Sequence, residues 1–227
     1  MKKLINKILG LAGKEIRSVN APLHTFEAGL RELKRRTPIG SVIDIGVAEG
    51  TPELYDVFKG YPMLLVEANP EYRELLDRLA AQLPARVEKV FCGAQEGIVK
   101  LYKNGRKASS LRYANRPEAA QVEVRVMPLD SLTGNLPAPY LIKIDVEGAE
   151  MEVLKGAQET LKNSAAVVVE TSIARQYEGG VELADVVSYM KDHGFSVYDM
   201  VEGAIIDGRL MQADLVFVPT DAPFRKL

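Results

Sequence analysis

The 227-residue sequence has no tryptophan, only two histidines and a single cysteine, Cys92. One cysteine excludes an intrachain disulfide and fits a reducing, cytoplasmic compartment. No apolar run approaches the roughly 18 residues of a membrane-spanning helix. The net charge is −2, so no global basic field indicates nucleic acid as a partner. These absences favour a globular protein with neither a membrane span nor a nucleic-acid partner.

Hydrophobic residues make up 47% of the chain, enough for the core of one α/β domain over residues 38–227. Residues 1–37 read as a helical extension. Its first helix spans residues 1–12, where Asn6 and Lys7 interrupt the apolar run and argue against a signal peptide. This helix packs on the domain or on a second subunit, or alternatively makes a weak membrane-surface contact. The oligomeric state stays open. A second helix is predicted over residues 25–36.

The most informative stretch is Leu-Ile-Lys-Ile-Asp-Val-Glu-Gly-Ala-Glu at residues 141–150. It predicts a strand, a glycine turn and a helix from Ala149 onward. Within the strand, Lys143, Asp145 and Glu147 alternate and therefore line one side of its carboxyl end. Ligands bind at that end in open α/β sheets, and ionisable groups are costly to bury without partners. The stretch is interpreted as a site; a local Lys–Asp pair on an edge strand is the alternative.

A second glycine turn follows a predicted strand at Val42–Ile45. Gly46 and Gly50 bracket the turn, Asp44 precedes it, and Thr51-Pro52 is typical of a helix N-cap followed by the first helical position. Such a turn presents backbone N–H groups to a polar or anionic ligand. The spacing is not the G-x-G-x-x-G of dinucleotide folds.

An acidic residue stands at the tip of the next predicted strand, residues 62–67. Glu67 lies 21 residues beyond Gly46, the usual position of a carboxylate that bonds ribose hydroxyls. Asn69-Pro70 then turns the chain into a helix over residues 71–82. A third strand over residues 87–92 ends at Gly93, and this end is expected to flank a bound base. Cys92 is read as a small buried residue rather than a nucleophile.

The remaining segments complete an alternating α/β pattern with one interruption. Residues 97–130 indicate an antiparallel insertion, of the kind that forms a lid or a substrate wall; Asp130 at its end suits a helix cap. A strand over residues 166–170 ends in Glu170, a helix covers 183–193, and last strands are expected at 195–200 and 214–218 with a turn region over 201–210.

Taken together, the sequence resembles the FkbM-type family of S-adenosylmethionine-dependent methyltransferases. The resemblance rests on four motifs and covers roughly residues 40–220. They are Val-Ile-Asp-Ile-Gly-Val-Ala-Glu-Gly at 42–50, Val-Glu-Ala-Asn-Pro at 66–70, Asp-Ser-Leu at 130–132, and Ile-Lys-Ile-Asp-Val-Glu-Gly-Ala-Glu at 142–150 with Val-Leu-Lys-Gly-Ala at 153–157. The last is the most specific. Val47 and Ala48 depart from the family's usual D-x-G-A-N-x-G, which removes one polar contact near the cofactor.

The resemblance implies a Rossmann-like class I methyltransferase fold: seven strands, six parallel and the last antiparallel, with helices on both faces and a β insertion before the fourth strand. It implies O-methylation of a hydroxyl on a sugar or secondary metabolite, with S-adenosylmethionine as cofactor. The expected cofactor-binding residues are Asp44, Gly46, Gly50, Glu67, Asn69 and Gly93. Asp145 or Glu147 would be the general base, with Lys143 setting their charge state.

Three alternatives remain at this point. Asp145, Glu147 and Glu170 could bind Mg²⁺ or Mn²⁺ through oxygen ligands, although no metal is required. A nucleotide-dependent oxidoreductase is disfavoured by the missing third glycine. A non-catalytic S-adenosylmethionine-binding module is disfavoured by the acidic sheet edge, for which such a module has no evident need.

Overall fold

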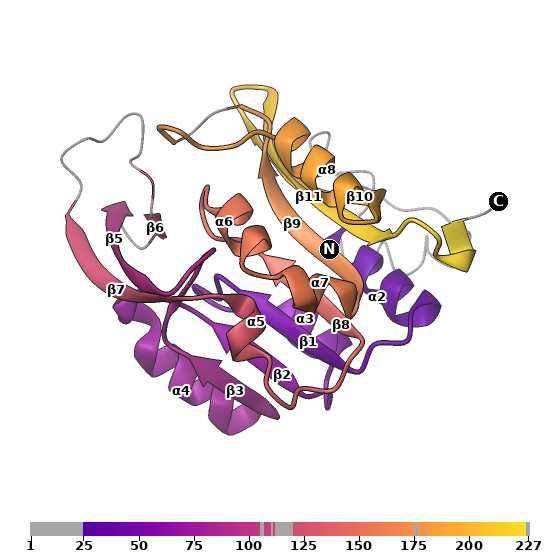
Figure 1. Cartoon of the computed structure of the whole chain (residues 1–227), viewed down its shortest axis with the longest axis horizontal. Helices are drawn as coiled ribbons and strands as arrows, with labels where there is room; N and C mark the ends of the chain where they lie inside the picture. The colour runs from indigo at the N-terminus through magenta and orange to yellow at the C-terminus, as the bar shows by residue number, and fades with distance from the viewer. Residues whose placement is uncertain (1–24, 105–106, 110, 112–119, 175–176, 226–227) are drawn as a thin grey trace, which may run out of the picture.

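A seven-stranded sheet forms the centre of the computed structural model, in the order β10-β11-β9-β8-β1-β2-β3 (Figure 1). β1, β2, β3, β8 and β9 are parallel, and β11 is antiparallel to both β9 and β10, so β10 shares the common direction. The predicted sheet is therefore confirmed. Its strands are β1 (Ser41–Ile45), β2 (Met63–Val66), β3 (Ala85–Glu88), β8 (Tyr140–Ile144), β9 (Ser164–Ser172), β10 (Phe195–Ile206) and β11 (Arg209–Pro219).

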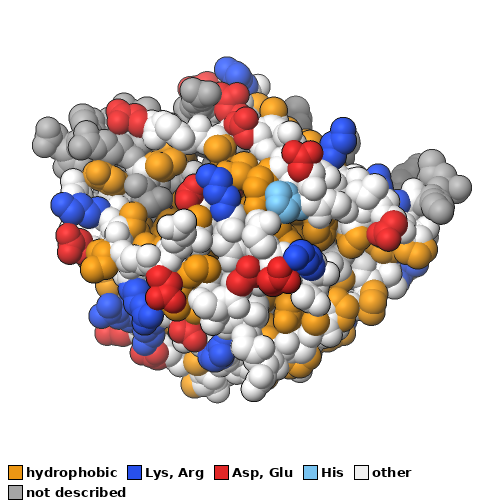
Figure 2. Space-filling view, in the orientation of Figure 1, with side chains coloured by type: hydrophobic (Ala, Val, Ile, Leu, Met, Phe, Trp, Pro, Cys, Tyr) orange, Lys and Arg blue, Asp and Glu red, His pale blue; other side chains and the backbone are white. Residues whose placement is uncertain are grey.

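The structure describes residues 25–104, 107–109, 111, 120–174 and 177–225. The predicted helix over residues 1–12 lies outside these ranges, so that helix and its membrane-surface alternative stay predictions. No helix in the described ranges combines the length and apolar character needed to cross a membrane. On the face seen in Figure 2, acidic and basic side chains are interspersed.

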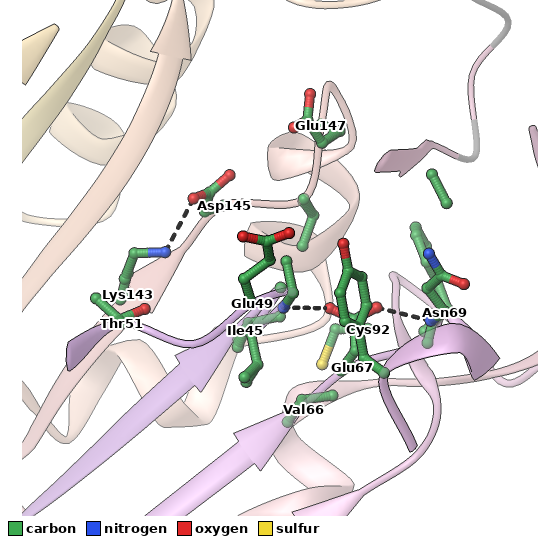
Figure 3. A pocket seen from close by; sticks show the side chains of 18 of the residues that line it. Ile45, Glu49, Thr51, Val66, Glu67, Asn69, Cys92, Lys143, Asp145 and Glu147 are labelled. Atoms are coloured by element: carbon green, nitrogen blue, oxygen red, sulfur yellow. Dashed lines mark hydrogen bonds and ion pairs between the residues drawn. The ribbon is translucent and has the colours of Figure 1, made fainter. Parts of the chain in front are cut away.

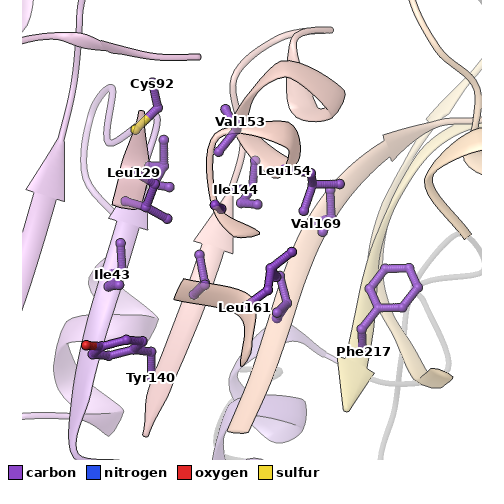
Figure 4. Packing of buried hydrophobic residues seen from close by; sticks show 14 of the residues in the cluster. Ile43, Cys92, Leu129, Tyr140, Ile144, Val153, Leu154, Leu161, Val169 and Phe217 are labelled. Atoms are coloured by element: carbon purple, nitrogen blue, oxygen red, sulfur yellow. The ribbon is translucent and has the colours of Figure 1, made fainter. Parts of the chain in front are cut away.

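Helices cover both faces of the sheet. They are α2 (Phe26–Arg36), α3 (Pro52–Val57), α4 (Arg73–Gln82), α5 (Leu129–Leu132), α6 (Glu150–Lys155), α7 (Gln158–Lys162) and α8 (Leu183–Asp192), with short 3₁₀ turns η1 (Pro70–Tyr72) and η2 (Pro223–Arg225). On one face, strand residues such as Ile43 and Ile144 pack against α5 to α8 (Figure 4). On the other, Val42 and Leu141 pack against α2, α3 and α4. Successive strand residues thus enter opposite cores, as a period of two requires.

The insertion forms a second, four-stranded sheet in the order β4-β7-β5-β6. Its strands are β4 (Phe91–Cys92), β5 (Gly97–Asn104), β6 (Lys107–Ser109) and β7 (Gln121–Met127). β5 pairs antiparallel with β6 and β7, as predicted, whereas β4 pairs parallel with β7. Because β4 pairs with β7, Cys92 is brought beside Met127, and the two ends of the insertion lie next to each other.

Three predicted elements have different bounds. The strand over 87–92 is divided, because β3 stays in the main sheet while β4 finds its partner in β7. The helix after Ala149 breaks at Gly156 into α6 and α7. The backbone N–H of Asp130 donates to the Gly156 carbonyl (3.0 Å), and its carboxylate caps α7 by accepting from the N–H groups of Glu159 and Thr160. Asp130 is therefore a cap, but of a distant helix.

The predicted turn over residues 201–210 is also wrong. β10 and β11 continue through it as a long hairpin that closes at Asp207-Gly208. Both residues have positive φ, 51° and 75°, which suits the tight turns that match the twist of a hairpin. The hairpin therefore extends past the carboxyl end of β9 and borders the candidate site.

Candidate functional site

A cavity of about 510 Å³ opens where β1, β2 and β8 end (Figure 3). It lies within the size range of small-molecule sites. Four of the predicted cofactor-binding residues line it: Gly46, Gly50, Glu67 and Asn69. The predicted catalytic residues Lys143, Asp145 and Glu147 line it as well. Because parallel strands end at one edge, three motifs far apart in the sequence meet here.

The Gly46–Gly50 turn is shaped by the chain that follows β8. Gly46 has φ +83°, and a Cβ at this position would lie 1.7 Å from the carbonyl oxygen of Asp145. The Asp145 N–H in turn donates to the Ile45 carbonyl (2.9 Å). Gly50 also has positive φ, +94°, but a Cβ there would meet nothing closer than 3.5 Å. The close approach of the two motif loops thus explains glycine at position 46 in particular.

Glu67 joins the two cofactor loops. One carboxylate oxygen accepts from the Ala48 N–H (2.8 Å) and the other from the Asn69 N–H (2.6 Å). The side chain is almost entirely buried, and burial raises its pKa, although the backbone N–H groups of Asn69, Ala48 and Ala68 oppose this shift. A carboxylate has about four acceptor positions, so these bonds leave acceptor capacity for a ligand on the cavity side.

Asp44, predicted as a cofactor ligand, instead lies beneath the cavity and does not line it. Its side chain is fully buried, and one oxygen accepts from the hydroxyls of Thr51 (3.1 Å) and Tyr55 (2.7 Å). Thr51 stands at the N-cap position of α3, but its hydroxyl serves Asp44 rather than the helix. Asp44 therefore supports the glycine turn from below.

Lys143 is a buried ammonium between two carboxylates. Its Nζ lies 3.0 Å from Asp145 and 3.8 Å from the second oxygen of Asp44, which has no hydrogen-bond partner. Asp44 and Lys143 are direct neighbours in the β1–β8 register. Burial alone would lower the pKa of Lys143, but the charges of Asp145 and Asp44 outweigh it and raise the pKa. Lys143 therefore stays charged and holds Asp145 at the cavity wall.

Glu147 occupies a constrained turn at the mouth of the cavity. Its φ of +55° is unusual for a residue with a side chain. The Tyr177 hydroxyl donates to its carboxylate, and the Ser109 hydroxyl donates to its carbonyl oxygen (2.6 Å). Gly148 has φ +98° and lies against the Tyr177 ring. The insertion and the chain after β9 thus both hold this turn.

Beneath this turn, Glu150 is a buried carboxyl that accepts from the Gly148 N–H (2.9 Å). Burial raises its pKa to about 7, against the effect of that hydrogen bond.

Gly93 lies away from the cavity: its carbonyl oxygen faces Gly156, which has no room for a Cβ. The neighbouring Cys92 lines the cavity and is buried, which raises the pKa of its thiol to about 12 and agrees with a packing role.

No three His, Cys, Asp or Glu side chains in the described ranges are placed to hold one metal ion. The alternative metal set of Asp145, Glu147 and Glu170 is dispersed: Asp145 pairs with Lys143, Glu147 with Tyr177, and Glu170 accepts from the Gln212 amide (2.8 Å). These partners leave the metal alternative without a supporting geometry.

Comparison with known proteins decides the family. Residues 44–197 match the methyltransferase FkbM domain, which is more than half of the chain. The chain belongs to this family. The match overturns the oxidoreductase alternative.

Solved structures share the fold of this FkbM-domain protein. A methyltransferase FkbM from Methylobacillus flagellatus is similar over 78% of this chain, with 18% identity and a TM-score of 0.54; the chain spans 43% of that protein. The fibrillarin/Nop5p complex is similar over 79% of this chain and 72% of that chain, with 14% identity and a TM-score of 0.50. A search of curated proteins found no match. The class I methyltransferase fold is therefore established by both architecture and likeness.

Sequence reasoning missed several residues of the site. Tyr55 and Tyr177 come from segments without a recognised motif, yet their hydroxyls hold Asp44 and Glu147. Gln212 and Asp214 lie on β11. Asp214 is the first residue of the strand predicted over 214–218, and Gln212 lies between that strand and the predicted turn. The one available signal was an isolated aspartate directly before the apolar run Leu-Val-Phe-Val at residues 215–218.

Proposed function

We propose that this protein transfers a methyl group from S-adenosylmethionine to a hydroxyl group of a small molecule or glycan, such as a sugar. The observation that carries the proposal is the joint lining of one cavity by the Glu67-bridged glycine turn and the Lys143–Asp145 pair. The Glu67-bridged turn is suited to a nucleoside, and the Lys143–Asp145 pair places a fixed carboxylate where a hydroxyl would react.

The site fits this donor at specific positions. Gly46 and Gly50 themselves place no side chain over the cavity, and the remaining acceptor capacity of Glu67 suits a ribose hydroxyl. Asn69 and the turn from Gly46 to Gly50 would contact the remainder of the nucleoside and the methionine end. The donor brings a sulfonium methyl that is already activated. The residues of this chain therefore need mainly to align the acceptor and to accept its proton.

Ligand binding gives the first test. S-adenosylhomocysteine at about 100 times its dissociation constant is expected to stabilise the fold by about 2.7 kcal/mol. For a chain of this size, that corresponds to a rise in Tm of about 5–10 °C in a thermal-shift measurement. NAD at the same concentration is the control and should give no comparable rise. A response to NAD without one to S-adenosylhomocysteine would contradict the proposal.

Acceptor chemistry is tested separately, by supplying radiolabelled S-adenosylmethionine with a panel of sugars and small alcohols. Transfer of label to a hydroxyl oxygen, located by mass spectrometry, supports O-methylation. Binding of the donor with transfer only to nitrogen or carbon acceptors would overturn that part of the proposal. A protein that binds the donor and transfers to no acceptor would match the non-catalytic module.

Replacing Glu67 with glutamine is expected to weaken S-adenosylhomocysteine binding tenfold or more. The amide keeps the size of the side chain but turns one acceptor into a donor, which then opposes the N–H of Ala48 or Asn69 and one ribose hydroxyl. Calorimetry measures the affinity, and the Tm without ligand reports any loss of folding. Glu49→Gln in the same cavity is the control; because Glu49 is exposed, a change below threefold is expected. Equal effects of the two variants would place the ribose elsewhere.

A further inference from the structure

A second cavity, of about 340 Å³, adjoins the first. The two share Gly50, Thr51, Lys143, Asp145 and Glu170 in their linings, and the β10–β11 hairpin supplies the outer wall of the second. A molecule bound here would lie directly beside one bound in the first cavity. If the first takes the methyl donor, as proposed above, the second is placed to take the acceptor.

The carboxylates that the sequence put forward as bases are already engaged. Asp145 is paired with the Lys143 ammonium at 3.0 Å. Glu147 accepts the Tyr177 hydroxyl and does not line the second cavity. Glu170 accepts the amide of Gln212. A base for an acceptor in the second cavity is therefore better sought among the other carboxylates of its lining.

Asp214 on β11 meets this requirement. It lines the second cavity and is partly buried, whereas Glu53 and Glu202 in the same lining are exposed. No hydrogen bond within the described part of the chain involves its carboxylate. Four charged groups face it from the neighbouring elements: Lys143 on β8, Asp145 after β8, Glu202 on β10, and Glu170, its register partner on β9.

We propose that Asp214 is the catalytic proton acceptor of this methyltransferase. The inference rests on the proposed function. In the step, the acceptor oxygen bonds to the methyl carbon as the sulfur–carbon bond breaks. The electron pair of that bond stays on sulfur, which becomes a neutral thioether, and the hydroxyl proton passes to an oxygen of Asp214. Lys143 stays protonated and keeps Asp145 in place as a hydrogen-bond acceptor that orients the hydroxyl.

The electrostatics of Asp214 agree with this role. Burial raises its pKa to about 7; Lys143 opposes the shift, and Asp145 and Glu202 add to it. A general base works best when its pKa lies near the operating pH, because it is then both ionised and basic enough to hold the proton.

The experiment compares two ligands that differ in charge at sulfur. S-adenosylmethionine carries a positive charge at sulfur, and S-adenosylhomocysteine is neutral there. Protein groups that affect the binding of both ligands equally as the pH changes do not alter the ratio of the two dissociation constants. Ionisation of a carboxyl near the sulfonium attracts that positive charge, so it should change this ratio about tenfold, which corresponds to roughly 1.4 kcal/mol. Calorimetry at intervals between pH 5.5 and pH 8.5 gives the ratio.

In the wild-type protein, preference for S-adenosylmethionine is expected to rise about tenfold through pH 7, and Asp214→Asn is expected to remove the rise. Glu150→Gln is the matched control: its pKa is also near 7, but it faces Gly148 from beneath the turn, so the rise should persist. With an acceptor from the labelling panel, Asp214→Asn should lower turnover by roughly 10²–10⁴-fold while S-adenosylhomocysteine affinity stays within threefold.

A ratio that does not change with pH in the wild-type protein would overturn the assignment, and so would a rise that persists in Asp214→Asn. The wild-type measurement needs no variant, so it tests the assignment even if Asp214→Asn is unstable. Normal turnover of Asp214→Asn would do the same and would return the role to Asp145 or Glu147. Failure of both ligands to bind is a different result, because it removes the proposed function itself.

Discussion

Replacing Lys143 with methionine is expected to lower the free energy of unfolding by about 3–5 kcal/mol, the usual cost of removing one partner from a buried ion pair. The loss comes from Asp44, which is fully buried and whose second oxygen has only the Lys143 ammonium, 3.8 Å away, to balance its charge. Asp145 is partly exposed and can be hydrated instead. Chemical denaturation measures the change, and a fall in Tm of between about 6 and 20 °C should accompany it.

Two variants show whether the loss is electrostatic. Asp145→Asn removes the more exposed carboxylate and leaves the Lys143–Asp44 pair in place, so it should cost less than Lys143→Met. The double variant with Asp44→Asn and Lys143→Met removes both buried charges and should recover much of the stability lost in the single variant. A cost below about 1 kcal/mol for Lys143→Met would show that Asp44 is compensated in another way. A double variant no more stable than the single one would point to lost packing.

The second large effect is expected at Gly46. Alanine at this position must adopt φ near +83°, which costs roughly 1–2 kcal/mol. Its Cβ would also meet the Asp145 carbonyl oxygen at 1.7 Å, so the backbone of one motif loop has to move. Overpacking of this kind costs typically about 1–3 kcal/mol. The total of about 2–5 kcal/mol should be accompanied by loss of S-adenosylhomocysteine binding, because both loops line the cavity.

Gly50→Ala separates the two costs of the Gly46 variant. Its φ is also positive, +94°, but the nearest atom to a new Cβ is 3.5 Å away. This variant should therefore show only the conformational cost of roughly 1–2 kcal/mol. Unfolding curves of the two variants, measured side by side, give the difference. Equal stabilities would mean that the loop after β8 yields easily and that the contact between the motif loops is not tight.

Much of the fold could be predicted because the strands carry their own signals. The apolar runs at β1, β2, β8 and β9 are short and bounded by glycine or acidic residues, and residues that alternate along them enter opposite cores. The same pattern placed Glu67, Lys143 and Asp145 at one sheet edge. Those predictions needed only local periodicity and the rule that parallel strands end together.

What could not be predicted depends on contacts distant in sequence. Whether residues 91–92 stay in the main sheet depends on β7, more than thirty residues later. Whether Thr51 caps its helix depends on the competing acceptor Asp44, and the burial of Asp44 beneath the cavity depends on Tyr55 and Lys143. Asp214 faces the site only because β11 is antiparallel and lies between β9 and β10. Such partners have no signature in a single segment.

The closeness of the two ends of the insertion has a consequence for how this protein can diversify. Residues 92 and 127 are direct neighbours in the β4–β7 pairing, and the Gly93 N–H donates to the Met127 carbonyl (3.1 Å). Segments whose ends meet can be lengthened, shortened or exchanged with little strain on their host. The insertion is thus a modular unit, and a chimera that takes this segment from a relative should fold on the same host. Leu101 and Ala108 of the insertion line the first cavity and no described insertion residue lines the second, so a borrowed segment would reshape one wall of the first cavity and leave the second unchanged.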